Sequence, residues 1–193
     1  NFMLEETETL TPYQNLGFEY VEEESLRDFT WQVGAMTAEE LALADKSKYG
    51  WSLETEVVHE GKQAVRLTSK AAGAFSEIHS PYLPINGGST YEVSYWVYLS
   101  GSETAKVSLG FNMIGAEGKP ASTELYWAVE SDVTGITDGW KKVTAYVTLP
   151  ADAAKMDLRF LVSGGNTDAI LDEITLTEMV DDGNQNLDFE SGM

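Results

Sequence analysis

The sequence predicts an all-β fold, an antiparallel β-sandwich, on the basis of three observations. Segments in which apolar and polar residues alternate with a period of two recur along the chain, as expected for strands with one buried face. Turn signals rich in Gly, Asn and Asp separate them, such as Asn86-Gly87-Gly88 and the expected hairpin turn Gly164-Gly165-Asn166. Only one stretch has the pattern of a helix. Eight to ten short strands with such turns are typical of a sandwich.

The alternation assigns an inner and an outer face to each expected strand. In residues 91–99 the odd positions are apolar, so Trp96 and Tyr98 point away from the core. Residues 106–113 place Asn112 on the outer face, and residues 156–164 do the same for Arg159. Further strands are expected at 140–150 and 169–178.

The rest of the chain predicts one helix and two polar ends. Thr37 and Glu40 have the spacing of a capping box, and good helix formers follow, which predicts a short helix near residues 38–46 inside an insertion. The expected organisation is an entry segment or linker at 1–13, a β-sandwich domain at 14–180, and a linker with the start of a possible next module at 181–193.

The composition excludes several classes of partner. The 193 residues include 32 acids against 12 Lys and Arg, a formal net charge of −20. Such a surface repels nucleic acid and anionic membranes, whereas it is compatible with neutral ligands and with calcium; much of the charge is explained by solubility alone. The absence of cysteine excludes disulfides and thiolate chemistry. No apolar run approaches the ~20 residues of a membrane helix.

The sequence contains no group of residues that argues for catalysis, so we expect the chain not to be an enzyme. Its two histidines, His59 and His79, have no obvious partner and are expected to be surface or packing residues. No glycine-rich phosphate loop is present, and among 32 acids accidental carboxylate pairs are expected. A β-jelly-roll enzyme such as a polysaccharide lyase is disfavoured because basic and histidine residues are scarce.

The order of the motifs resembles that of a known family. Asn15-Leu-Gly-Phe-Glu19 is followed by Trp31, EGKQAVRLTS (60–69), INGGSTYEVSYWVYLSG (85–101), GITDGWKKVTAYVTLP (135–150) and AILDEITLTE (169–178). In this order the chain is similar to the jelly-roll carbohydrate-binding modules of the families 4, 9 and 22 type, which belong to the galactose-binding-like superfamily. The resemblance implies a non-catalytic module that binds a polysaccharide, within a larger secreted bacterial protein that degrades glycans. Asn-Leu-x-Phe-Glu recurs at 186–190, which implies a neighbouring module of the same polypeptide.

The resemblance also implies a structural calcium ion. In the resembling modules the residues that match Glu19 and Asp172 share Ca²⁺ with backbone carbonyls of a loop, here around Gly61 and Lys62. A hard cation accepts such a mixture of carboxylate and carbonyl oxygens. The alternative is that Glu19 and Asp172 are merely exposed at the ends of strands.

Large aromatic side chains on outer faces suggest where a glycan would bind. Exposed rings are costly unless something covers them, and the C–H face of a pyranose can do so. Trp127 lies in a segment in which either face could point inward. The polar side chains on outer faces would then bond the sugar hydroxyls. The expected carbohydrate site comprises Trp96, Tyr98, Asn112, Trp127 and Arg159.

Two alternatives remain open at this point. The 32–59 insertion could cover Trp96, which would then belong to a secondary core instead of a sugar platform. The whole domain could also be a structural or adhesion spacer of a bacterial multi-domain surface protein that binds no sugar.

Trp140, which opens a strand after the Asp138-Gly139 turn, is expected to be structural.

Overall fold

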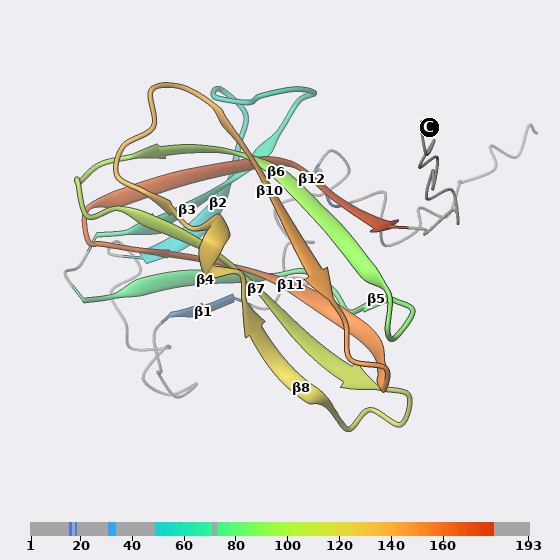
Figure 1. The fold of residues 1–193 in the computed structure, drawn as a ribbon. Helices are drawn as coiled ribbons and strands as arrows, with labels where there is room; N and C mark the ends of the chain where they lie inside the picture. The colour runs from blue at the N-terminus through green and yellow to red at the C-terminus, as the bar shows by residue number, and fades with distance from the viewer. Residues whose placement is uncertain (1–15, 17, 19–30, 34–48, 71–72, 180–193) are drawn as a thin grey trace, which may run out of the picture.

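Two antiparallel sheets lie face to face in a computed structural model that describes residues 16, 18, 31–33, 49–70 and 73–179 (Figure 1). The larger sheet consists of β1 (Trp31–Val33), β4 (Phe75–His79), β5 (Leu83–Pro84), β7 (Lys106–Gly115), β8 (Pro120–Trp127), β9 (Val133–Thr134) and β11 (Ala153–Ser163). The smaller sheet consists of β2 (Tyr49–Glu54), β3 (Ala64–Ser69), β6 (Thr90–Ser100), β10 (Lys141–Thr148) and β12 (Thr167–Met179). The predicted all-β sandwich is confirmed.

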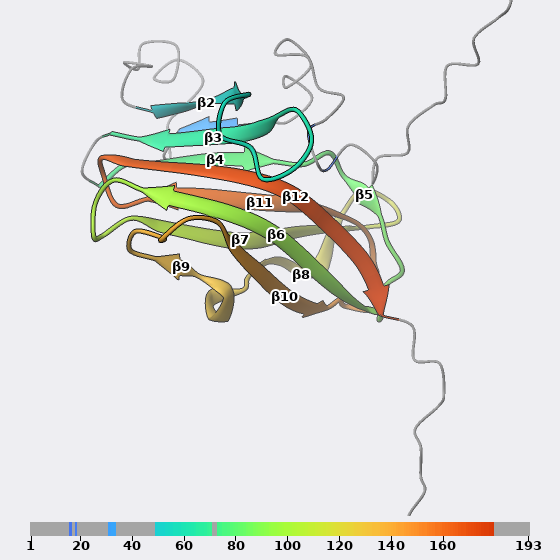
Figure 2. The ribbon, with the colours of Figure 1, turned by 90° about the horizontal axis from the view of Figure 1, so that it is seen from above.

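The strands do not follow chain order within either sheet. The larger sheet has the order β1-β4-β11-β7-β8, with β5 paired to β11 and β9 paired to β7. The smaller sheet has the order β10-β6-β12-β3-β2, which Figure 2 shows from above. Strands β8 and β10 are therefore edge strands of the two sheets. A bulge in β8 interrupts its pairing with β7, because Leu125 pairs with Asn112 but the next pair is Pro120 with Ile114.

The core lies between the two sheets and consists of the side chains that the alternation assigned inward. The buried residues of the expected strands at 91–99, 106–113 and 156–164 are Tyr91, Val93, Tyr95, Val97 and Leu99; Val107, Leu109, Phe111 and Met113; and Met156, Leu158, Phe160 and Val162. Tyr95 and Phe160 meet across the core edge to face, with ring centroids 5.0 Å apart. Leu16 and Phe18 of the N-terminal motif are also buried, which ties that motif to this domain.

The glycine-rich turns connect the two sheets. Gly164-Gly165-Asn166 was predicted to be a hairpin turn, but this is wrong, because β11 and β12 belong to different sheets. Gly101 and Gly164 have φ values of 112° and 110°. A Cβ atom on Gly101 would lie 2.0 Å from the Asn166 carbonyl oxygen, and one on Gly164 would lie 2.1 Å from that of Thr104. These crossings pack backbone against backbone, and only glycine fits there.

Helical structure is scarce in the part of the chain that the structure describes. It contains one 3₁₀ turn, η3 (Val129–Ser131), directly after β8. None of its helices could span a membrane. The helix predicted near residues 38–46 and the predicted end segments 1–13 and 181–193 lie outside the described residues.

Candidate functional site

The residues predicted to bind carbohydrate are divided between two faces of the sandwich. Trp96 and Tyr98 point outward from β6, in the smaller sheet. In the larger sheet, Arg159 of β11 pairs with Gly110 of β7, and Gly110 pairs with Trp127 of β8, so both side chains lie on its outer face. Asn112, two residues from Gly110, lies on the same face. The five residues therefore do not form one site.

The ring of Trp96 is covered by a neighbouring side chain. His59 stacks on it, with ring centroids 3.9 Å apart and an interplanar angle of 18°. Trp140 meets His59 edge to face at 5.5 Å and Tyr98 at 5.9 Å, which gives Trp140 a packing role. His59 is the last residue of the 32–59 segment. The stack therefore agrees with the alternative interpretation, in which this segment covers Trp96 and makes it part of a secondary core.

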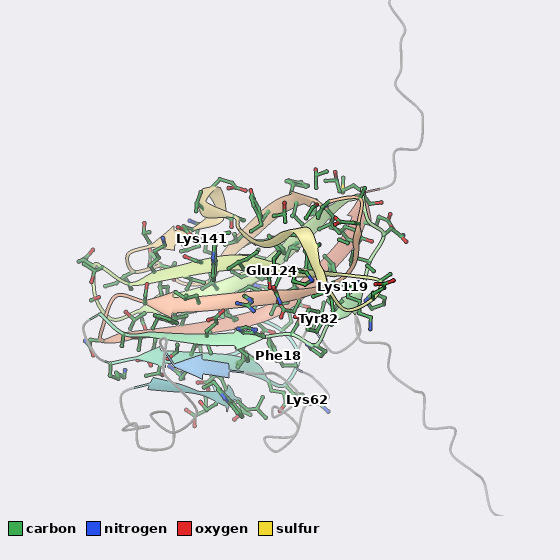
Figure 3. All side chains as sticks on the ribbon, turned by 90° about the horizontal axis from the view of Figure 1, so that it is seen from below. Phe18, Lys62, Tyr82, Lys119, Glu124 and Lys141 are labelled. Atoms are coloured by element: carbon green, nitrogen blue, oxygen red, sulfur yellow. The ribbon has the colours of Figure 1, made fainter. Side chains whose placement is uncertain are left out.

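A layer of nearly buried polar side chains lies on the outer face of the larger sheet, which Figure 3 shows from below. Glu77 and His79 of β4, Asp157 of β11 and Asn112 of β7 are between 4% and 9% exposed. Arg159 is adjacent, because its Cα pairs with that of His79. Polar groups are costly to bury unless they are paired, so their partners decide what this layer does.

Charges of opposite sign alternate within this layer. His79 Nε2 lies 2.9 Å from Glu77 Oε1, and Nδ1 lies 3.5 Å from Asp157 Oδ2. Arg159 reaches the same two carboxylates at 3.7 Å and 3.4 Å. Burial lowers the pKa of His79, but Asp157 and Glu77 together raise it by more, so the pKa lies above its ordinary value.

The contact between His79 and Glu77 becomes an ion pair when the imidazole is protonated. Nε2 and Oε1 are 2.9 Å apart, and the two groups attract each other as opposite charges when the ring is protonated. Neither atom has a hydrogen-bond partner within the described part of the chain. Attraction between opposite charges therefore contributes to holding the layer together. Some of its buried polar atoms have no hydrogen-bond partner among the described residues.

Two aromatic side chains flank the polar layer. Tyr82, between β4 and β5, is 42% exposed, and its hydroxyl accepts a hydrogen bond of 2.5 Å from Asn112 Nδ2. The six-membered ring of Trp127 lies over Gly110, where a Cβ atom would be 2.7 Å from its Cε3 atom. A pocket of about 160 Å³ beside this indole is bordered by Leu161. The missing side chain of Gly110 therefore makes room for an aromatic ring on the sheet.

Several residues of this face were missed by the sequence reasoning. Glu77 and His79 alternate with buried Ser76 and Ile78 in the short segment FSEIH, so the period of two could have placed them outward. The expectation that neither histidine has a partner is wrong. His79 lies between two carboxylates, and His59 Nδ1 contacts Glu173 Oε2 as well as stacking on an indole. Tyr82 has no pattern around it that could have identified it.

Asp172, a predicted calcium ligand, is buried in β12 and bonded to the predicted loop. It is 1% exposed, so the alternative of an exposed residue at a strand end is wrong for this position. Its Oδ2 atom accepts the backbone N–H groups of His59 (2.7 Å) and Glu60 (3.2 Å), and Oδ1 accepts that of Glu173 (2.7 Å). Among the described residues Oδ1 thus has one hydrogen-bond donor, which leaves it a lone pair with which a cation could bind.

The other predicted calcium positions that the structure describes, Gly61 and Lys62, lie in the loop that is bonded to Asp172. Gly61 and Lys62 directly follow the residues bonded to Asp172. Gln63 Nε2 donates a hydrogen bond of 2.8 Å to the Phe18 carbonyl, so the residue before Glu19 also lies at this loop. Glu19 itself is outside the described residues. In addition, His59, Glu60 and Glu173 offer ligand atoms within 4.8 Å of one another.

The family model of the carbohydrate binding domain CBM_4_9 matches residues 43–168, which is more than half of the chain. The chain belongs to this family. No curated protein sequence matches it.

Solved structures share the fold at low sequence identity. The enzymatically active domain of bacteriophage CBA120 tailspike protein 4 has a TM-score of 0.58 and 11% identity, over 84% of this chain and 20% of that chain. The CBM22-1–GH10 modules of Clostridium thermocellum xylanase 10B, complexed with xylohexaose, give 0.54 and 15%, over 78% and 26%. TmCBM61 in complex with β-1,4-galactotriose gives 0.54 and 16%, over 89% and 100%. The chain thus spans about a fifth of the first structure's chain and about a quarter of the second's.

Proposed function

We propose that the module binds a polysaccharide on the outer face of the larger sheet. The observation that carries this proposal is the nearly buried polar layer outside the core, with Tyr82 on one flank and Trp127 on the other. A spacer domain has no need for ion pairs and aromatic rings side by side on a sheet face. A glycan needs both, because each sugar ring has an apolar C–H face and a rim of hydroxyls.

Each group on this face has a distinct role in the proposal. Trp127 is the platform for a sugar ring, held in place by the close approach to Gly110. Tyr82, bonded to Asn112, offers a second ring and a hydroxyl, and Arg159 offers N–H donors beside them. Because these side chains already have partners in the free module, little conformational entropy is lost on binding.

The ligand that fits best is a neutral polysaccharide of β-1,4-linked pyranoses. A formal net charge of −20 opposes the approach of anionic glycans such as polyuronates. Two structures with this fold contain xylohexaose and β-1,4-galactotriose, which are both neutral. We place the module in a secreted bacterial protein, as a non-catalytic unit beside other modules of the same polypeptide, one of which degrades the glycan.

Affinity electrophoresis tests the proposed function. We expect retardation by at least one of xylan, β-1,4-galactan, β-1,4-mannan and hydroxyethylcellulose, and none by polygalacturonate at low salt. Bovine serum albumin on the same gels controls for sieving. If none of the neutral polysaccharides retards the module, glycan binding is wrong and the spacer interpretation stands.

We also propose a structural calcium ion held by Asp172 and Glu19, with carbonyl oxygens of Gly61 and Lys62. Three features support it: the lone pair that remains on Asp172 Oδ1, the burial of that carboxylate, and the hydrogen bond that brings the N-terminal motif to this loop. When bound, the ion would tie the N-terminal motif, the loop and the closing strand together.

Removal of calcium is expected to lower the melting temperature. Calcium at about 100 times its dissociation constant should add about 2.7 kcal/mol to the free energy of unfolding. Asp172→Asn should abolish this response. Asp168→Asn is the matched control, because Asp168 lies on the same strand but pairs with Lys70 and Thr68. Identical melting curves of the wild type in chelator and in calcium would contradict the site.

A further inference from the structure

A small pocket, called the side pocket below, lies on the outer face of the larger sheet beside the Trp127 ring. It has a volume of about 160 Å³ and is lined by Lys106 and Ser108 of β7, Trp127 of β8, Val129 of η3, Asp132, and Leu161 of β11. This volume is well below the range of about 300–1,000 Å³ that is typical of ligand pockets. The side pocket therefore has room for part of one sugar unit and not for a whole oligosaccharide.

The register of β7 places the side pocket next to the proposed platform. The Trp127 ring lies over Gly110, and the two preceding residues of β7 that share this face are Ser108 and Lys106. Residues two apart on a strand are separated by about 7 Å. Because Tyr82 is bonded to Asn112, on the other side of Gly110, the side pocket extends the proposed glycan face beyond the platform and away from Tyr82.

An ion pair forms one wall of the side pocket. Lys106 Nζ lies 2.5 Å from Asp132 Oδ2, and the two side chains are 40% and 15% exposed. The other carboxylate oxygen, Asp132 Oδ1, is buried and has no hydrogen-bond partner within the described part of the chain. A nearly buried carboxylate needs a partner for its charge, so Asp132 holds the Lys106 ammonium group beside the pocket.

The backbone fixes this wall on both sides of Asp132. Before it, the N–H of Ala128 donates a hydrogen bond of 3.0 Å to the carbonyl of Leu109 in β7. After it, Thr134 of β9 pairs with Lys106 of β7. Both ends of the short loop are therefore tied to the strand that forms the floor of the pocket. The wall is preformed, so little conformational entropy is lost when a ligand binds.

The two charged groups offer complementary hydrogen bonds to a sugar. An ammonium group only donates and a carboxylate only accepts, whereas a hydroxyl does both. Two hydroxyl oxygens on adjacent ring carbons are about one hydrogen-bond length apart, as are Lys106 Nζ and Asp132 Oδ2. One hydroxyl can therefore accept from Lys106 while its neighbour donates to Asp132. Since the pair is neutral as a whole, a neutral ligand suits it better than an anion.

We propose that the side pocket recognises two adjacent free hydroxyls of one sugar unit through Lys106 and Asp132, and so determines which stretches of a glycan bind. This inference rests on the proposed function, because it takes the glycan to lie on the Trp127 ring. In a 1,4-linked pyranose chain, the adjacent free hydroxyls of an internal unit are those at C2 and C3. The small volume leaves no room for a substituent on either oxygen, so the module should select unsubstituted units at this position.

Isothermal titration calorimetry tests the two charged residues. The probes are xylohexaose, cellohexaose, mannohexaose and β-1,4-galactotriose, and variants are compared on the probe that binds the wild type most tightly. Lys106→Met and Asp132→Asn should each weaken binding by about tenfold or more, because a hydrogen bond to a charged group is lost. Lys106→Arg keeps N–H donors and the positive charge, so its affinity should remain within about threefold of the wild type.

The chain contains a matched control for this ion pair. Lys70 Nζ lies at the same distance, 2.5 Å, from Asp168 Oδ2, but this pair belongs to the smaller sheet. Lys70→Met and Asp168→Asn should leave the affinity unchanged. Melting curves show which variants are folded. Ser108→Leu, which fills the floor of the side pocket but retains both of its charges, should also weaken binding by about tenfold and keeps the test valid if the charge variants are unstable.

Amide chemical shifts of the ¹⁵N-labelled module locate the ligand, which a purely structural role of the ion pair would not affect. At saturation with the same probe, we expect shifts at residues 106–108 and 131–134 in addition to those at residues 110–112 beside the platform. In Ser108→Leu the shifts at 131–134 should disappear, whereas those at 110–112 should persist.

The outcomes separate this inference from the proposed function. Unchanged affinity in folded Lys106→Met and Asp132→Asn, or shifts confined to residues 110–112, would overturn the side pocket and leave the proposed face intact. An equal loss of affinity in the Lys70 and Asp168 variants would also overturn it, because the effect would then come from charge in general. If no probe binds the wild type, the proposed function and this inference are both wrong.

Discussion

Replacement of Trp127 by alanine is expected to weaken polysaccharide binding by about thirtyfold or more. Truncation of a central aromatic residue in a binding site typically costs about 2 kcal/mol or more, which corresponds to that factor. The ring lies on the outer face of the larger sheet, against Gly110, and contributes nothing to the core between the sheets. Affinity electrophoresis and calorimetric titration with the polysaccharide that retards the wild type would measure the loss.

Two further variants show whether the position of the ring matters. Gly110→Ala retains the indole but places a Cβ atom 2.7 Å from it, so the ring must move and affinity should fall in the same direction. Trp96→Ala, on the opposite face, should retain full affinity while lowering the melting temperature, because the stack with His59 is lost. Unchanged affinity in Trp127→Ala, or lost affinity in a folded Trp96→Ala, would place the site elsewhere.

The second large effect is expected from His79→Ala, which should lower the free energy of unfolding by about 3 kcal/mol or more below a pH of about 6.5, where the imidazole is charged. At that pH the substitution removes a cation from between two nearly buried carboxylates, Glu77 and Asp157. Breaking a buried pair on one side leaves an uncompensated charge, and such losses are commonly about 3–5 kcal/mol. Arg159 contacts both carboxylates and limits the loss.

The stability of the wild type should depend on pH through the same histidine. Because the pKa of His79 is raised in the folded protein, its contribution is complete below the unfolded value of about 6.5 and is lost as pH rises through the folded value. Stability should therefore decline from slightly acidic to mildly alkaline pH. Urea unfolding across this range should show a smaller decline in His79→Ala. An equal decline in both proteins would assign the pH dependence to other groups.

The sequence predicted which residues of a strand face the core, but not which sheet each strand joins. The inner faces of β6, β7 and β11 follow from a local period of two, which is set by burial alone. Sheet membership depends on pairing between distant segments, such as β4 with β11. Trp96 was expected on an outer face, and either face of the segment that contains Trp127 could point inward. Nothing in the local pattern separates the smaller sheet from the larger one.

The sequence could not predict which residues meet in the candidate site, for a related reason. Asp157 follows His79 by 78 residues, so no spacing rule connects them, and the sheet brings them together. The recess for Trp127 depends on the absence of a side chain at Gly110, which sequence reasoning treated as one more position in an alternating strand. By contrast, Asp172 and its loop were found through motif order, because both belong to motifs of the resembling family.

The bulge in β8 also governs how copies of the module behave when they are crowded together. A regular edge strand presents a row of unpaired N–H and C=O groups on which the strand of another molecule can add. In β8 only Leu125 to Trp127 keep a continuous ladder with β7, and Asp152 already occupies the backbone N–H of Ser122. The edge therefore offers a short and irregular template. Modules at high local concentration can therefore lie side by side without the pairing of their edge strands into larger sheets.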